Sequence, residues 1–161
     1  MVQTPLEVLI KGCLAGLAGA LAIRLSTQIT APIPPPGAPV GESDPRYLFV
    51  EKVSSCLFEK EMPDPERRSW AELAHWAYGS LWGMLYGVLQ SSLRLPSLLH
   101  GLLLGTIAWV AGPLFLGPAM RLVPPPRPSP LSQTMTGWVH HAVFGVTTAV
   151  VYRLLRGDAN R

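Results

Sequence analysis

The histidines are the residues of this sequence whose type and spacing could do chemistry. His75 and His141 each stand about two turns into a strongly apolar segment, and His140 directly precedes the second of them. An imidazole inside a membrane can carry protons or contact a solute, and two facing imidazoles can hold a haem iron. Three interpretations stay open: interfacial residues that bond backbone or lipid headgroups, a proton or solute site, and the axial ligands of a b-type haem.

His75 and His141 each begin a similar pattern of small and aromatic residues. His75 is followed by glycine at every fourth position as far as Gly87, and His141 is followed at the same spacing by Gly145. A tyrosine stands eleven residues after each histidine. The candidate intramembrane polar site therefore comprises His75, His140, His141, Tyr86 and Tyr152.

Glycines at intervals of four form one face of a helix and let a second backbone approach closely. In lipid, where burying apolar surface between helices gains little, such close packing holds helices together. We therefore interpret these glycines as helix-packing seams rather than as a groove for a cofactor. The candidate packing residues are Gly12, Gly16, Gly79, Gly83, Gly87, Gly101, Gly105 and Gly145.

Other chemistries have little support in the sequence. It contains no HExxH, GxSxG or Walker A pattern and no spaced carboxylate pair, so it does not predict an enzyme. Cys13 and Cys56 do not form a CxxC pair, and the basic residues form no stripe. We therefore expect no metal and no cofactor apart from the haem alternative at His75 and His141, and no nucleic-acid partner.

The composition indicates a membrane protein. Of the 161 residues, 48% are hydrophobic and 14% charged, whereas soluble domains carry about 25% charged residues. The ionisable residues between Trp70 and Leu122 are Glu72, His75, Arg94, His100 and Arg121. The length favours a single domain over 1–161, with the lipid bilayer as its first partner.

Four apolar segments are long enough to cross a bilayer, which needs about 20 helical residues. They cover approximately 6–25, 70–90, 98–122 and 134–155. The sequence thus predicts an all-α membrane protein with four transmembrane helices. If these are wound in sequence order, the second and fourth are diagonal and bring His75 and His141 to one depth, whereas His100 lies toward the opposite face.

The long connection over 26–68 and the ends of the helices carry further signals. It begins with a proline strap, and then "PRYLFVEKVSSCLFEK" places Phe49, Val53 and Cys56 on one face of an amphipathic surface helix. A partner-binding helix is the alternative. Ser69 and Glu72 have the spacing of a capping box, which predicts the start of the second crossing.

The third crossing contains two prolines, Pro113 and Pro118. Each lacks an N–H group, so we expect a kink or a short unwound stretch there. A packing kink is the simpler interpretation, and carbonyls exposed to a solute are the alternative.

The chain also shows a weak internal repeat. "KGCLAG" resembles "HGLLLG", "PPP" occurs twice, and "HWAYG" resembles "HAVFG". The spacing of these matches predicts two repeated helical hairpins, the first of which carries the amphipathic segment as an insertion. Corresponding helices of such a repeat run in the same direction, and the Lys/Arg distribution weakly places the proline straps in the cytoplasm.

The order of these motifs resembles that of the YagU-like family of small bacterial inner-membrane proteins. The resemblance lies in "PERRSWAELAHWAYGSLWGMLYGVL" and in "GWVHHAVFGVTTAVVYRLL", and it covers roughly residues 45 to 156. It implies a multi-pass protein of the bacterial inner (plasma) membrane and supplies no reaction. We therefore expect a structural or accessory membrane protein that packs into a bundle, an oligomer or a larger membrane complex. The alternatives are a small transporter or channel with a histidine-lined path and a b-type haem protein.

Overall fold

A computed structural model describes residues 3–30, 45–58, 62–93, 95–120 and 131–157. All the regular structure in these ranges is helical, as predicted. The proline straps lie outside the described residues, as do residues 31–44 and 59–61 of the long connection. The elements are α1 (Pro5–Thr30), α2 (Pro45–Phe58), α3 (Asp64–Ser92), α4 (Ser97–Trp109), the π-helical segment η1 (Val110–Leu116), α5 (Gly117–Ala119) and α6 (Leu131–Arg156).

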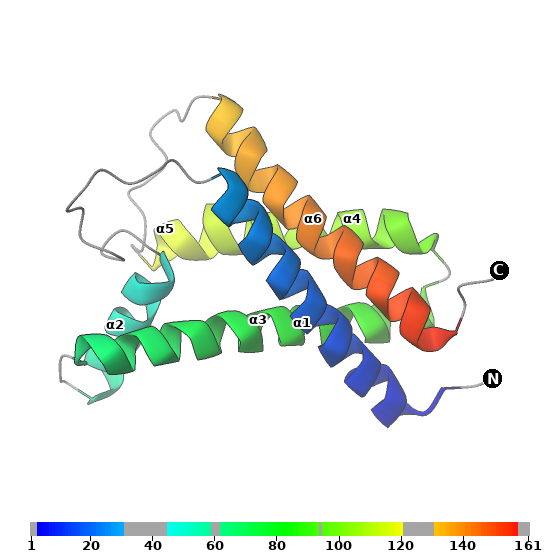
Figure 1. Ribbon diagram of the computed structural model, residues 1–161, viewed down its shortest axis with the longest axis horizontal. Helices are drawn as coiled ribbons and strands as arrows, with labels where there is room; N and C mark the ends of the chain where they lie inside the picture. Colours follow the sequence, from blue (N-terminus) through cyan, green and yellow to red (C-terminus); the bar gives the residue numbers. More distant parts are fainter. Residues whose placement is uncertain (1–2, 31–44, 59–61, 94, 121–130, 158–161) are drawn as a thin grey trace.

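The long helices alternate in direction, so the two ends of the chain lie at one end of the molecule and α2 lies at the other (Figure 1). The most extensive packing joins α1 to α3, α1 to α6 and α4 to α6. By contrast, α3 and α4 contact each other little although they follow one another in the chain. The contact between α3 and α6 is also small, as expected for diagonal helices.

Two of the four predicted crossings meet the length and apolarity expected of a membrane span. These are α1 and the continuous helical stretch Ser97–Ala119, which comprises α4, η1 and α5. Of the 18 residues in the most apolar window, 33% are buried in α1 and 28% in Ser97–Ala119. The apolar surface of both helices therefore faces mostly outward, unlike that of a core helix in a soluble protein.

The predicted seam between α1 and α3 is a backbone-to-backbone contact. A Cβ atom placed on Gly12 would lie 2.6 Å from Gly83 O, and one on Gly16 would overlap Gly79 O. Gly87 lies against Val8 O in the same seam, where an added Cβ would come within 2.8 Å. Only glycine lets the two helices approach so closely, so this face sets their separation.

The second seam joins α4 to α6 in the same way. An added Cβ on Gly145 would overlap Gly101 O and lie 2.7 Å from Gly105 N, just as one on Gly83 would overlap Gly12 O and lie 2.5 Å from Gly16 N. The two helix pairs therefore repeat one crossing geometry.

The contacts correct the register of that repeat. They match Gly83 with Gly145, and they match Gly79 with His141, because Gly79 O faces Gly16 and His141 O faces Gly105. The resemblance of "HWAYG" to "HAVFG" is thus one helical turn out of step with the packing. His75 and His141 do not occupy equivalent positions of the repeat.

The capping-box prediction for the second crossing is wrong. α3 begins at Asp64, six residues before the predicted first helical residue Trp70, and Ser69 lies inside it with its hydroxyl donating to Pro65 O at 3.1 Å. Two prolines at the helix start suit its first turn, where an N–H has no intrahelical partner. The connection is accordingly shorter than 26–68 at both ends, since α1 continues to Thr30.

A capping box does occur at the start of α1, where sequence analysis did not predict one. Thr4 N donates to Glu7 Oε2 at 2.9 Å, and Glu7 N donates to Thr4 Oγ1 at 3.3 Å. These reciprocal bonds satisfy two backbone donors that the first turn of a helix leaves free. Glu72, assigned this role by its spacing, is instead part of an ion-pair cluster described below.

The predicted amphipathic helix is present as α2, but it presents a different face to the protein. Val50 and Ser54 are buried, and α2 packs on α3. Phe49, predicted for the apolar face, is 36% exposed. Arg67 of α3 pairs with Glu51 of α2 at 3.4 Å, and the Lys52 ammonium donates to Met120 O. α2 is therefore held by polar contacts on two sides.

The prolines of the third crossing distort the helix without ending it. Pro113 lies inside η1, where the helix widens to π-helical geometry over Val110–Leu116. A π-helical turn accommodates a residue without an N–H by shifting the hydrogen-bond pattern. The predicted distortion thus exists, and its form is a bulge within a continuous helical stretch.

Candidate functional site

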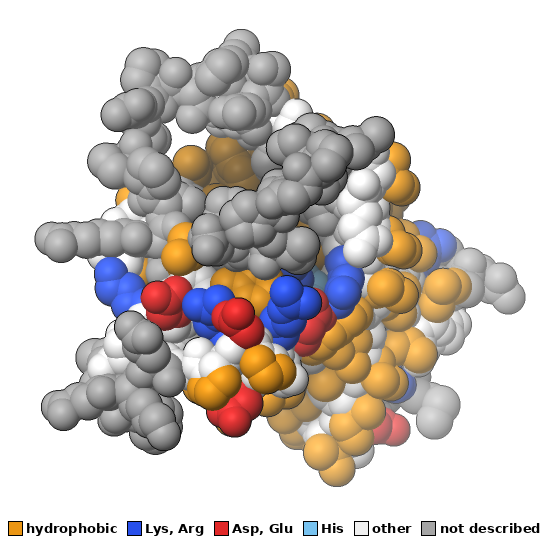
Figure 2. Space-filling model, turned by 60° about the vertical axis from the view of Figure 1, so that its left-hand side comes forward, with side chains coloured by type: hydrophobic (Ala, Val, Ile, Leu, Met, Phe, Trp, Pro, Cys, Tyr) orange, Lys and Arg blue, Asp and Glu red, His pale blue; other side chains and the backbone are white. Residues whose placement is uncertain are grey.

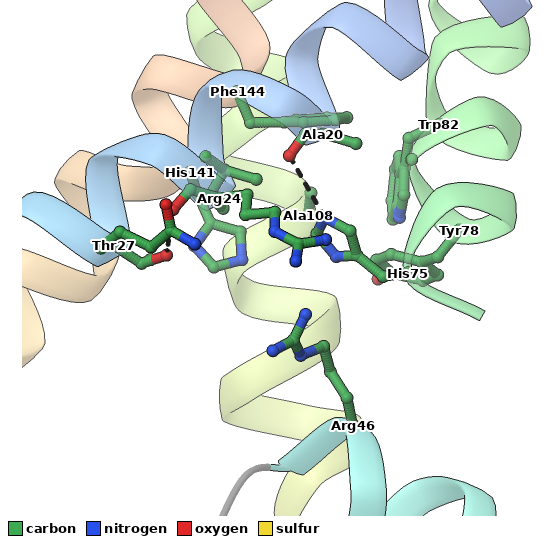
Figure 3. Close-up of a pocket in the computed structure, with 13 residues that line it drawn as sticks. Ala20, Arg24, Thr27, Arg46, His75, Tyr78, Trp82, Ala108, His141 and Phe144 are labelled. Atoms are coloured by element: carbon green, nitrogen blue, oxygen red, sulfur yellow. Dashed lines mark hydrogen bonds between the residues drawn. The ribbon is translucent and has the colours of Figure 1, made fainter. Parts of the chain in front are cut away.

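A cavity of about 520 Å³ lies near the α2 end of the molecule, where α3 and α4 diverge. It is shared by five helices, so the fold and not one motif creates it (Figure 3). The lining residues are Ala20, Ile23, Arg24, Thr27 and Gln28 of α1, Arg46 of α2, His75, Tyr78, Gly79 and Trp82 of α3, Ala108 of α4, and His141 and Phe144 of α6.

The cavity brings together the two histidines that the sequence singled out. His75 Nε2 is 3.2 Å from Ala20 O, the carbonyl of the helix packed against it. His141 Nδ1 is 2.9 Å from Gly137 O, one turn earlier in its own helix. Each imidazole is thus oriented by a backbone carbonyl, which accepts its N–H. Both rings line the cavity.

His140 does not belong to this cavity. Its Nδ1 is 2.9 Å from Ser26 Oγ and its Nε2 is 3.0 Å from Thr30 Oγ1, so both ring nitrogens contact the last turns of α1. These hydroxyls also bond carbonyls of α1, Ser26 to Ile23 O at 2.8 Å and Thr30 to Ser26 O at 3.0 Å. His140 therefore links α6 to the end of α1.

An ion-pair cluster borders the cavity on the α2 side. Glu72 of α3 pairs with Arg24 of α1 and, at 3.6 Å, with Arg46 of α2. The three side chains are about one-third exposed, so the pairing contributes little stability but fixes where the two guanidinium groups lie. In Figure 3, Arg24 projects into the space between His75 and His141, and Arg46 points toward the same space from α2.

The walls of the cavity are apolar and aromatic. Tyr78 and Trp82 meet edge to face with ring centroids 6.0 Å apart, and Phe144 is buried on the opposite helix. The cavity thus combines an apolar interior with two cationic groups at one margin. None of the described residues that line it carries a carboxylate.

The two tyrosines of the predicted polar site lie in a second cluster, near the chain ends. Tyr86 and Tyr152 meet edge to face with centroids 5.5 Å apart, and both are essentially buried. Tyr86 OH donates to Ser97 O at 3.2 Å, and Tyr152 OH to Gly87 O at 3.4 Å. A cavity of about 400 Å³ adjoins them, lined also by Arg153 and Arg156.

His100 belongs to this second cluster. Its ring lies 4.8 Å from that of Tyr86, its Nδ1 contacts Gln90 Oε1, and its side chain is 5% exposed. The expectation that His100 lies at the opposite end from His75 therefore agrees with the structure. Sequence analysis predicted one polar site from five residues, whereas the structure divides them among two clusters and a helix-to-helix link.

A packed core separates the two clusters. It contains Ala15, Leu104, Phe144 and Ala149 together with the two tyrosines. Within the described residues, no group of three His, Cys, Asp or Glu side chains is placed to hold a metal ion. No described residue lines both the cavity near His75 and the cavity at the second cluster.

Comparison with known proteins adds no assignment. No family model, no curated protein and no solved structure matches the chain. The site must therefore be interpreted from its own geometry.

Proposed function

We propose that this protein crosses a membrane four times, through α1, α3, the stretch Ser97–Ala119 and α6. The observation that carries the proposal is the pairing of helices. Each of the two apolar candidate spans packs against one of the less apolar helices, α1 on α3 and α4 on α6, with glycine-mediated backbone contact. A span held so closely brings its partner through the bilayer with it.

The positions of charged residues support four crossings. Within the described helices, residues 12–23, 73–92, 97–119 and 131–152 contain no Lys, Arg, Asp or Glu. The charged side chains lie toward the two ends, and Figure 2 shows a band of them at the end that carries α2, beside a broad apolar surface. Large apolar side chains face outward between the ends, among them Leu14, Leu81, Leu103 and Ile107, each at least 44% exposed.

The role that we propose is non-enzymatic: a structural or accessory subunit in a bacterial inner membrane. The resemblance to YagU-like proteins favours that membrane. All eight predicted packing glycines contact other helices of the same chain. A larger assembly would therefore use the outward apolar faces rather than the glycine seams.

A small transporter or channel is the second candidate, favoured by the cavity that His75 and His141 share. Against it, no described residue lines both this cavity and the one near the chain ends, and Leu104, Phe144 and Tyr152 belong to a packed core. A solute path would need this core to open.

Purification in mild detergent tests the accessory role. We expect the protein to migrate as a complex larger than one chain, with the same copurifying membrane protein in independent preparations. A monomer without copurifying protein would contradict an accessory role. Uptake of a solute by vesicles that contain the pure protein, lost in His75→Ala and His141→Ala, would favour the transporter instead.

A further inference from the structure

We propose that the cavity beside His75 binds one anionic lipid, with the phosphate at Arg24 and Arg46 and an acyl chain among the aromatic walls. The distribution of charge and apolar surface over one cavity is the starting observation. Two guanidinium groups stand at its margin, and Ile23, Trp82 and Phe144 line its interior. An amphiphile with an anionic head and an apolar tail matches both parts.

The cationic margin is held in place before any ligand arrives. Glu72 pairs with both arginines, and those three side chains come from three helices. Among the described residues at the margin, the charged groups of this cluster are two arginines and one glutamate, with a net positive charge. The Arg24 guanidinium has five N–H donors, so its pairing with Glu72 leaves donors for phosphate oxygens.

The histidines complete the surroundings without opposing an anion. His75 and His141 line the cavity, and each has one ring nitrogen engaged with a backbone carbonyl. Thr27 and Gln28 add neutral polar groups near Arg24. Among the described residues, a phosphate at the margin therefore meets cationic and neutral groups. The Glu72 carboxylate repels it less because it is already paired with Arg24 and Arg46.

The size and location of the cavity fit a lipid. Its volume of about 520 Å³ falls within the roughly 300–1,000 Å³ of ligand sites. It lies at the end of the bundle where the band of charged side chains begins (Figure 2). In membrane proteins, basic pockets between helices at such a membrane surface bind the headgroups of anionic lipids. The location at a membrane interface rests on the four-span proposal, whereas the binding chemistry does not.

Quenching of tryptophan fluorescence tests the proposal, because Trp82 lines the cavity. The full chain in a non-ionic detergent is titrated with phosphatidylglycerol whose acyl chain carries bromine atoms, and with phosphatidylcholine carrying the same chain. We expect saturable quenching by phosphatidylglycerol at about tenfold lower mole fraction, since both lipids carry the phosphate but the two guanidinium groups repel the choline cation of phosphatidylcholine. Trp82→Phe should remove the saturable component.

Charge and space are then tested separately. Arg46→Gln, on the peripheral helix α2, should weaken phosphatidylglycerol binding about tenfold, and Ala108→Leu should abolish it by filling the cavity without altering charge. Arg156→Gln, at the other end of the molecule, is the matched control and should bind like the unchanged protein.

Three results would overturn the proposal. They are equal quenching by the two lipids, unchanged binding in Arg46→Gln when the variant has the same helical content, and displacement of the lipid by free glycerol phosphate. The last would show a site for a soluble phosphate ester. Because the assay is done in detergent, its failure leaves the four-span proposal standing, and topology mapping can fail while lipid binding succeeds.

Discussion

Substitution of Gly83 should separate α1 from α3 and destabilise the protein. In Gly83→Ala the new Cβ would lie 2.5 Å from Gly16 N and overlap Gly12 O, whereas real Cβ contacts essentially never fall below 3.0 Å. Both neighbours are backbone atoms, so no side-chain rotation relieves the contact and α1 must move. Such overpacking typically destabilises by about 1–3 kcal/mol.

Helix propensity acts in the opposite direction, because alanine in a helix is favoured over glycine by about 1 kcal/mol. We therefore expect Gly83→Ala to lower the free energy of unfolding by up to about 2 kcal/mol. Gly112→Ala is the matched control, since its added Cβ would meet only Tyr78 OH, at an ordinary 3.4 Å. This control should be neutral or stabilised by up to about 1 kcal/mol.

The assay is unfolding of the detergent-solubilised protein by added dodecyl sulfate, followed by circular dichroism. The two alanine variants should differ by about 2 kcal/mol in free energy of unfolding, with Gly83→Ala the weaker. Trp82→Leu, although Trp82 lies off the glycine seam, would serve poorly as a control because Trp82 packs against the core. Equal stability of Gly83→Ala and Gly112→Ala would refute the interpretation of the seam.

Three further expectations follow from the described contacts. His140→Ala removes the contacts to Ser26 and Thr30 and should lower the free energy of unfolding by about 1–2 kcal/mol. In the double variant Ser26→Ala/Thr30→Ala, the same His140 substitution should be nearly neutral. If the losses in free energy of unfolding simply add, His140 does not link α6 to α1 through these hydroxyls. The protein purified from membranes should show no Soret band, and a band that disappears in both His75→Ala and His141→Ala would establish the haem alternative. Glu72→Gln should change stability by less than about 1 kcal/mol, because the pairs are one-third exposed, and a larger loss in a dodecyl sulfate titration would show that they act as a buried network.

Much of the fold could be predicted from the sequence because apolar length and glycine spacing determine it directly. The presence of the helices, the position of α2 and the glycine seams could each be predicted, because each depends on a residue pattern within one segment of the chain. The start of α3 could not be predicted from the capping-box spacing, since Asp64, Pro65 and Glu66 form an equally good first turn and Glu72 is drawn into pairs with Arg24 and Arg46.

The candidate site was predicted in part. His75 and His141 share a cavity, but the tyrosines that follow them at equal spacing point to a separate cluster. The length of helix between them explains this difference, because eleven helical residues rise about 16 Å and bring each tyrosine toward the other end of the molecule. Arg24 and Arg46 were missed as site residues because they come from distant helices, and their alternation with apolar residues gave no motif.

The central claim is that the chain crosses the membrane four times, and labelling of single cysteines tests it most directly. In a background with Cys13 and Cys56 replaced by serine, cysteines at Gly41, Ser92, Pro126 and Asn160 are exposed to a membrane-impermeant maleimide from one side of intact cells or sealed vesicles. We predict that positions 41 and 126 share one side and that 92 and 160 share the other. If α1 and Ser97–Ala119 alone crossed, positions 41 and 92 would be labelled from one side and 126 and 160 from the other, and that result would contradict the account.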